Sequence, residues 1–176
     1  MHKVLPFCNI LIGNETEAET WAVENRLDET KDLAKIAKAL AIIPRTNPSR
    51  PRIVVITHGA ESTILVSSAQ PDVTKEYPVE KLDDSQIVDT NGAGDAFAGG
   101  FIGAYVSGKD LDDCVRAGHA LASICVQQVG RTATHEYRTK SDMILGRPSV
   151  QVAQSQDPIE LQLHCCPPIV TTRPAE

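Results

Sequence analysis

A glycine-rich turn followed by an aspartate is the segment of this sequence whose residue types and spacing could do chemistry. The turn reads Asn91-Gly92-Ala93-Gly94-Asp95 and stands directly before an apolar stretch that is typical of a helix. Gly92 and Gly94 have no Cβ atom, so a ligand could approach the backbone closely at these positions. The free amide groups and the positive dipole end of the helix would point at that ligand. The segment therefore predicts a binding site for an anion such as phosphate.

Asp95 would stand in the first turn of this helix, at the mouth of the anion site. An ionised carboxylate at that place could take the proton of a hydroxyl group while its oxygen attacks phosphorus. Many acidic residues in a first helical turn only complement the helix dipole. If Asp95 is considered without its neighbours, a role in complementing the helix dipole is favoured over a catalytic role.

Two other glycine-rich turns are poor matches to this segment. In the dinucleotide-binding fingerprint a third glycine is required where this chain has Phe97. The sequence holds no Gly-x-x-x-x-Gly-Lys-Ser/Thr string, which excludes a Walker loop. A lone Gly-x-Gly is weak support for any function, whereas the nine residues from Asp89 to Phe97 form a longer and more specific signature.

Apolar runs alternate with amphipathic stretches from Pro6 to Gly130, and these elements would position the glycine turn. The predicted strands are 8–13, 52–57 and 62–67, followed by an edge strand and loop over 70–85. The strand 62–67 either makes a hairpin with 52–57 or lies beside it. The predicted helices are one that begins at Glu15 with Asn14 as its N-cap, one over 33–40, one over 94–106 and one over 111–129. Strands that alternate with helices are typical of a layered α/β fold with a largely parallel sheet.

Composition narrows the class of protein. Among the 176 residues, 17 Lys and Arg face 23 Asp and Glu, and the net charge of -6 argues against a nucleic-acid partner. No apolar run reaches the ~18 residues of a membrane span, and the first residues do not form a signal peptide. We therefore expect a cytoplasmic protein, with the nucleus as a second compartment, and no membrane partner.

The five cysteines predict neither a disulfide framework nor a zinc site, because their count is odd and no Cys-x-x-Cys pair occurs. We expect Cys8, Cys114 and Cys125 to be buried as small hydrophobic residues. Residues 131–176 hold five of the eleven prolines and show no sustained period. Such a segment buries too little apolar surface to offset its ordering entropy, so we expect a disordered tail.

Three strings, in this order along residues 4–130, resemble signatures of the ribokinase-like (PfkB) family of sugar and nucleoside kinases. They are Ile12-Gly13-Asn14-Glu15-Thr16-Glu17-Ala18, Asp89-Thr90-Asn91-Gly92-Ala93-Gly94-Asp95-Ala96-Phe97 and Arg116-Ala117-Gly118-His119-Ala120. The resemblance implies a three-layer α/β fold, mostly parallel, and an ATP-dependent phosphotransferase that uses ATP with Mg²⁺. Within the family, the strings are most similar to members that phosphorylate the 5′-hydroxyl of adenosine. A sugar kinase and a catalytically inactive, nucleotide-binding chain are the alternatives.

The resemblance assigns roles to the matched positions of the glycine turn. Asp95 would be the catalytic base that activates the acceptor hydroxyl. Gly92, Ala93 and Gly94 would form the anion hole for the transferring phosphoryl group. The positions that would contact ATP are Thr57, Gly59, Thr90, Asn91 and His119. For His119, a hydrogen-bonded helix histidine without a ligand is an equally good explanation.

Asn14 and Glu17 match the Asn-x-x-Glu motif of the family, which helps to organise magnesium and phosphate. Their plainer explanation is a helix N-cap and a favourable first-turn carboxylate, and both roles are compatible at a helix end near the phosphates.

Members of the family are longer than this chain. By resemblance, residues 1–130 are the carboxy-terminal part of the kinase domain, which binds ATP and carries the catalytic residues, and residues 131–176 are a divergent tail. The lid domain and the aspartate that holds the ribose of the acceptor belong to the half that has no counterpart here. We expect the complete protein to be a monomer.

Overall fold

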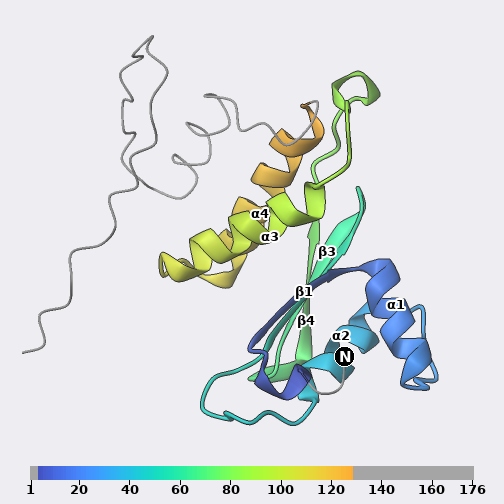
Figure 1. Ribbon diagram of the computed structural model, residues 1–176, viewed down its shortest axis with the longest axis vertical. Coiled ribbons are helices and arrows are strands. Elements are labelled where there is room, and N and C mark those ends of the chain that lie inside the picture. The colour runs from blue at the N-terminus through green and yellow to red at the C-terminus, as the bar shows by residue number, and fades with distance from the viewer. Residues whose placement is uncertain (1–3, 129–176) are drawn as a thin grey trace, which may run out of the picture.

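The computed structural model describes residues 4–128, which form a four-stranded sheet with two helices on each side (Figure 1). The strands, in their order across the sheet, are β1 (Ile10–Asn14), β2 (Ile53–His58), β3 (Ser62–Ser67) and β4 (Gln70–Pro78). The helices are α1 (Glu15–Glu24), α2 (Leu33–Ile42), α3 (Ala93–Val106) and α4 (Leu111–Val126), with short 3-10 helices at Leu5–Phe7 and Asp84–Gln86.

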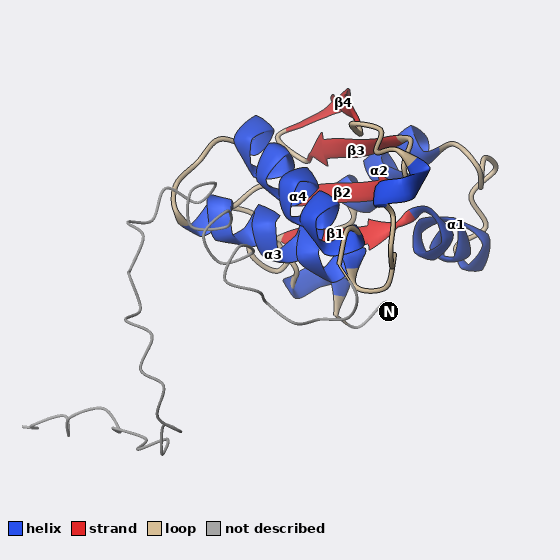
Figure 2. Ribbon diagram, turned by 90° about the horizontal axis from the view of Figure 1, so that it is seen from above, coloured by secondary structure: helices blue, strands red, loops and turns tan. Residues whose placement is uncertain are grey.

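The sheet is mixed, so the expectation of a mostly parallel sheet is wrong for the described strands (Figure 2). β1 and β2 are parallel, whereas β2–β3 and β3–β4 are antiparallel. Short turns join β2 to β3 and β3 to β4, and a short turn permits only an antiparallel pair. β1 reaches β2 through α1 and α2, and a crossover of this length is what a parallel pair requires.

The predicted helices and strands are otherwise present. β1 begins at Ile10 rather than at residue 8, and β4 is the edge strand expected within 70–85. α4 ends at Val126 with Gln127 as its C-cap, so the helix predicted over 111–129 is too long at 127–128, and residue 129 lies outside the described residues. The expected tail over 131–176 also lies outside them. Within residues 4–128 no helix is long and apolar enough to cross a membrane.

The two faces of the sheet carry separate apolar cores, because side chains alternate along each strand. On one face, Val54, Ile56 and Val66 pack with α1 and α2. On the other face, Ile53 and Val55 pack with α3 and α4. The described part is thus a three-layer α/β arrangement, and β2 is apolar throughout its centre because both of its faces are buried.

Arg52, the residue before β2, is fully buried and ties three segments together. Its guanidinium donates hydrogen bonds to the carbonyl oxygens of Leu5 (2.6 Å), Cys8 (3.0 Å), Leu40 (3.0 Å) and Ile43 (2.8 Å). The last two carbonyls belong to the end of α2, where helix carbonyls lack partners and carry the negative dipole end. Burial lowers the pKa of Arg52, but an arginine still keeps its charge.

α3 and α4 approach each other through two glycines that leave no room for a side chain. A Cβ atom on Gly100 would lie 2.5 Å from the carbonyl oxygen of Ala117. A Cβ atom on Gly118 would lie 2.7 Å from the ring of Phe97. The spacing of this helix pair is therefore set by backbone contact, which cannot yield as a flexible side chain would.

Gly100→Ala is expected to lower the free energy of unfolding by about 1–3 kcal/mol, because the added methyl group forces α3 away from α4. Urea denaturation of the whole chain measures the change. Gly99→Ala is the matched control, since no atom lies within 4 Å of its Cβ position and alanine favours a helix by up to ~1 kcal/mol. Equal losses in both variants would contradict the proposed close contact.

Candidate functional site

The predicted glycine turn lies directly before α3, and Gly92 is the N-cap of that helix. Gly92 has φ +83°, in the left-handed region that favours glycine. The amide of Ala93 donates to the carbonyl oxygen of Thr90 at 3.3 Å, and the amide of Ala96 donates to that of Gly92 at 2.9 Å. A Cβ atom on Gly94 would meet no atom within 4 Å, so the backbone of the first helical turn borders open space.

The end of α4 holds this turn in place. The amides of Val88 and Asp89 both donate to the carbonyl oxygen of Val126, at 2.8 and 3.2 Å. The thiol of Cys125 lies 3.7 Å from the carbonyl oxygen of Asn91, and the amide of Asn91 donates to the Asp89 carboxylate at 2.9 Å. Cys125 is half-buried rather than buried, as is Cys8, whereas Cys114 is buried as predicted.

Asp95 lies in the first turn of α3, and its side chain is exposed. Thr90 and Asn91 are exposed just before the turn, and the backbone of Gly94 is exposed beside Asp95. One continuous segment thus presents helix amides and a carboxylate at the same place. An arrangement of this kind can bind a phosphate and offer it a proton acceptor.

Asn14 and Glu17 form a capping box at the start of α1. The Asn14 side chain accepts from the amide of Glu17 at 2.8 Å, and the Glu17 carboxylate accepts from the amide of Asn14 at 3.0 Å. A Cβ atom on Gly13 would lie 2.8 Å from that carboxylate, so the glycine leaves room for it. The N-cap explanation is therefore confirmed. Among residues 4–128, the hydrogen bonds of this capping box stay at the start of α1 and do not join it to Gly92 or Gly94.

Polar residues line up across the sheet at one end of the strands. Thr57 pairs with Asn14 on β1 and with Thr63 on β3, and Thr63 pairs with Tyr77 on β4. The hydroxyl of Thr57 donates to the carbonyl oxygen of Gly13 at 3.3 Å. This row, which we call the polar row (Asn14, Thr57, Thr63 and Tyr77), ends the apolar core that faces α3 and α4.

Gly59 lies in the turn between β2 and β3, with φ +50° and no atom within 4 Å of its Cβ position. Next to it, the His58 ring lies 3.1 Å from the Glu61 carboxylate. The open space at Gly59 is compatible with the predicted contact to ATP.

His119 joins α4 to both β3 and α3. Its Nε2 atom lies 2.8 Å from the hydroxyl oxygen of Thr63, and its ring centre lies 5.5 Å from that of Phe97. Burial lowers the pKa of His119, so the imidazole is neutral at pH 7. The histidine is hydrogen-bonded within the protein, as the plainer explanation required. Through Phe97 it also contacts the helix that the glycine turn begins.

α4 is fixed to the sheet at a second place. The Tyr77 hydroxyl donates to the Asp112 carboxylate, and the Lys75 ammonium lies 2.6 Å from the same carboxylate. Burial, and then the bond to Asp112, raise the pKa of Tyr77, so its hydroxyl keeps its proton. Sequence reasoning missed this contact and the one between Thr63 and His119. The only local signal was a polar residue, Thr63, at an inward position of a strand.

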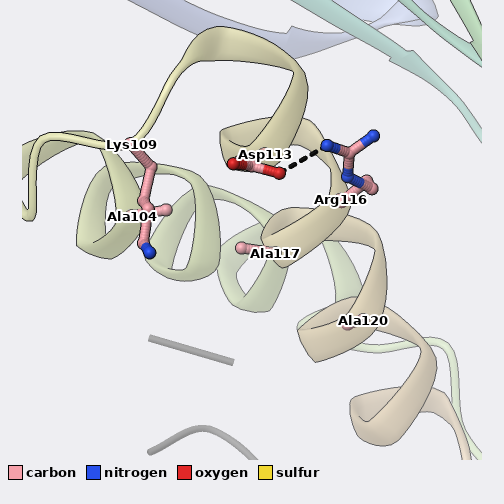
Figure 3. A pocket seen from close by; sticks show the side chains of 6 residues that line it. All are labelled: Ala104, Lys109, Asp113, Arg116, Ala117 and Ala120. Carbon is pink, nitrogen blue, oxygen red and sulfur yellow. Dashed lines mark hydrogen bonds and ion pairs between the residues drawn. The ribbon is translucent and has the colours of Figure 1, made fainter. Parts of the chain in front are cut away.

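A second feature of the surface lies away from the glycine turn. A pocket of about 310 Å³ opens between the end of α3 and the start of α4 (Figure 3), and the residues that line it are Ala104, Lys109, Asp113, Arg116, Ala117 and Ala120. Asp113 and Arg116 form an ion pair at its rim. In the part of the chain that the structure describes, no group of three or more His, Cys, Asp or Glu side chains is arranged to hold a metal ion.

This chain is similar to known proteins in sequence and in fold. The profile of the pfkB family carbohydrate kinases matches residues 1–137. Adenosine kinase of Schizophyllum commune is 55% identical over 130 residues, which are 74% of this chain and 38% of that protein. This chain thus spans about two fifths of the curated relatives that it matches.

Solved structures of adenosine kinase and ribokinase are similar to this chain in fold. Anopheles gambiae adenosine kinase, in complex with P1,P4-di(adenosine-5) tetraphosphate, matches with a TM-score of 0.70 and 36% identity over 85% of this chain and 40% of that chain. A ribokinase from Thermotoga maritima matches with a TM-score of 0.66 and 24% identity over 84% of this chain and 45% of that chain, which shows the ribokinase-like fold alone.

Proposed function

The chain belongs to the pfkB family of carbohydrate kinases, and from this premise we propose that residues 1–130 form the ATP-binding and catalytic part of an adenosine kinase. The complete reaction would transfer the γ-phosphoryl group of ATP to the 5′-hydroxyl of adenosine and give AMP and ADP. The observation that carries the proposal is the glycine turn. It opens a 14-residue helix at a positive φ angle, next to open space and a first-turn carboxylate.

The anion hole would consist of backbone amides at Gly92, Ala93 and Gly94. Helix amides bind phosphate without a basic side chain, and the helix dipole adds to their field. Gly94 fits this role because an approaching phosphate oxygen would find no Cβ atom there and, apart from its neighbours in the chain, no other residue close by. Since the amides are held in place before phosphate binds, they could stabilise charge on the transferring group without rearranging.

Asp95 would act as the catalytic base. Its exposed carboxylate stands on the same helical turn as the anion hole, so an acceptor hydroxyl next to the phosphate would lie within its reach. The proton of the 5′-hydroxyl would pass to the Asp95 carboxylate as the oxygen bonds to phosphorus and ADP departs. In phosphoryl transfer most of the catalysis comes from positioning and charge stabilisation, and the base handles the proton.

The remaining predicted residues would bind ATP together with Mg²⁺. The bound magnesium ion would supply positive charge that neutralises the phosphates of ATP. Glu17 offers a carboxylate of the kind that magnesium or its water accepts, although one of its oxygens already bonds to the amide of Asn14. Asn14 and Thr57 stand at the carboxyl ends of the parallel pair β1 and β2. Open α/β sheets bind their ligands at such ends, which agrees with the predicted ATP contact of Thr57. The other predicted contacts are Gly59, Thr90, Asn91 and His119.

The names of the relatives support adenosine as the acceptor, rather than a sugar. None of the groups that would bind the acceptor is assigned to residues 4–128. We therefore expect this part of the chain to bind MgATP but not adenosine. We also infer that the complete enzyme is a cytoplasmic monomer. The free thiols of Cys8, Cys114 and Cys125 support a reducing compartment.

Asp95→Asn is expected to lower kcat by about 10²–10⁴-fold, the usual contribution of a general base. The assay uses a chimaera in which residues 1–130 replace the matching segment of the Schizophyllum commune relative, with adenosine and MgATP as substrates. Asp84→Asn is the matched control, because this carboxylate is exposed and lies outside the signature from Asp89 to Phe97. Turnover of the Asp95 variant near that of the unmodified chimaera would end the assignment of the base. A comparison of adenosine with ribose tests the acceptor.

Gly94→Ala and Gly92→Ala are expected to separate binding from stability. Gly94→Ala adds a methyl group in open space at a helical position, so the chain keeps its stability while its affinity for MgATP falls at least tenfold. Gly92→Ala forces alanine into a left-handed conformation and costs about 1–2 kcal/mol of stability as well. Calorimetric titration and thermal denaturation measure the two effects. Unchanged affinity in Gly94→Ala would exclude phosphate binding at this turn.

A further inference from the structure

Thr63 is a buried polar side chain that no assigned role explains. It is 1% exposed, and with Arg52 it is one of two buried polar or charged residues in the described part of the chain. It lies on β3 and faces α3 and α4, as does Leu65 two residues later. Its hydroxyl oxygen is 2.8 Å from Nε2 of His119, which is 56 residues away in the sequence. A buried hydroxyl needs such a partner, since an unsatisfied one is costly.

This hydrogen bond decides which part of the His119 ring is available. The neutral imidazole carries one N–H group, and its other nitrogen is an acceptor. Because the hydroxyl of Thr63 occupies Nε2, only Nδ1 remains for another molecule. The ring of Phe97 contacts the imidazole at an interplanar angle of 51°. Thr63 at one nitrogen and Phe97 at the ring together fix the position and tilt of the imidazole.

The two residues that fix the ring belong to elements that also carry groups which the proposed function assigns to ATP. On one side, Phe97 belongs to the helix that begins at the glycine turn. On the other side, Thr63 pairs with Thr57 at the end of β2. His119 is only half-buried, so the residue is not enclosed within the core.

We propose that Thr63 is a positioning residue for nucleotide binding: its hydroxyl holds Nε2 of His119 so that a bound nucleotide meets Nδ1. The inference rests on the proposed function, because it takes the ligand of His119 to be the nucleotide. Thr63 itself is buried and does not touch the ligand. It acts through the orientation of the imidazole, which is set before the nucleotide arrives.

The test measures MgATP affinity of the whole chain by calorimetry in a double-mutant cycle. Thr63→Val removes the hydroxyl at nearly constant shape and is expected to weaken binding about tenfold, the size of one hydrogen bond. Thr63→Ser keeps the hydroxyl and is expected to restore affinity to within about threefold of the wild type. In a His119→Ala background, Thr63→Val should have no further effect, because its action passes through the histidine. Ser62→Ala on the same strand is the control for general disturbance.

The ¹⁵N shifts of the His119 imidazole give a second readout that does not depend on ligand. In the wild type and in Thr63→Ser the Nε2 shift is expected to be that of a hydrogen-bonded nitrogen, and in Thr63→Val it is expected to move because that bond is lost. Unchanged shifts in Thr63→Val, or equal losses of affinity with and without His119, would overturn the inference while the proposed function stands. A wild-type chain that does not bind MgATP would overturn the proposed function and this inference with it.

Discussion

The close contact between α3 and α4 determines where the predicted phosphate-binding groups lie. α3 begins at the glycine turn, and the carbonyl oxygen of Val126, the last residue of α4, accepts the amides of Val88 and Asp89 just before that turn. Gly100 and Gly118 allow the two backbones to approach until further movement is blocked by backbone and by the ring of Phe97. α4 is in turn held on the sheet by the bonds of Asp112 and His119. The turn is therefore positioned by the whole layer rather than by its own loop.

The two ends of the sheet carry polar groups with different tasks. Before β2, Arg52 donates to backbone carbonyls and joins α2 to the segment that precedes β1. At the opposite end of β2, Thr57 stands in the polar row with Asn14 and Thr63. Between them the strand is apolar and buried on both faces, which leaves it little freedom to shift. A buried, rigid centre with polar groups at one end suits a sheet that presents its carboxyl ends to a ligand.

Local patterns in the sequence predicted most of the elements, because period and capping depend on near neighbours. Asn14 was found as an N-cap, and its reciprocal bond with Glu17 follows from the same short string. The relative directions of the strands were not predicted correctly. The short turns after His58 and Ser67 make β2–β3 and β3–β4 antiparallel pairs, where a mostly parallel sheet was expected. Contacts across long separations, such as Arg52 with Leu5 and Thr63 with His119, leave no periodic signal. The roles of the site residues came from a specific signature, and geometry alone does not assign them.

The central claim is that the backbone amides at the start of α3 bind the terminal phosphates of a nucleotide beside the carboxylate of Asp95. The most direct measurement is a titration of the ¹⁵N-labelled chain with MgATP, followed through the backbone amide resonances. The account predicts that the largest saturable shifts occur at Gly92, Ala93 and Gly94, and that inorganic phosphate at high concentration shifts the same amides. Saturable shifts that leave these three amides unchanged, or no saturable shift at all, would contradict it.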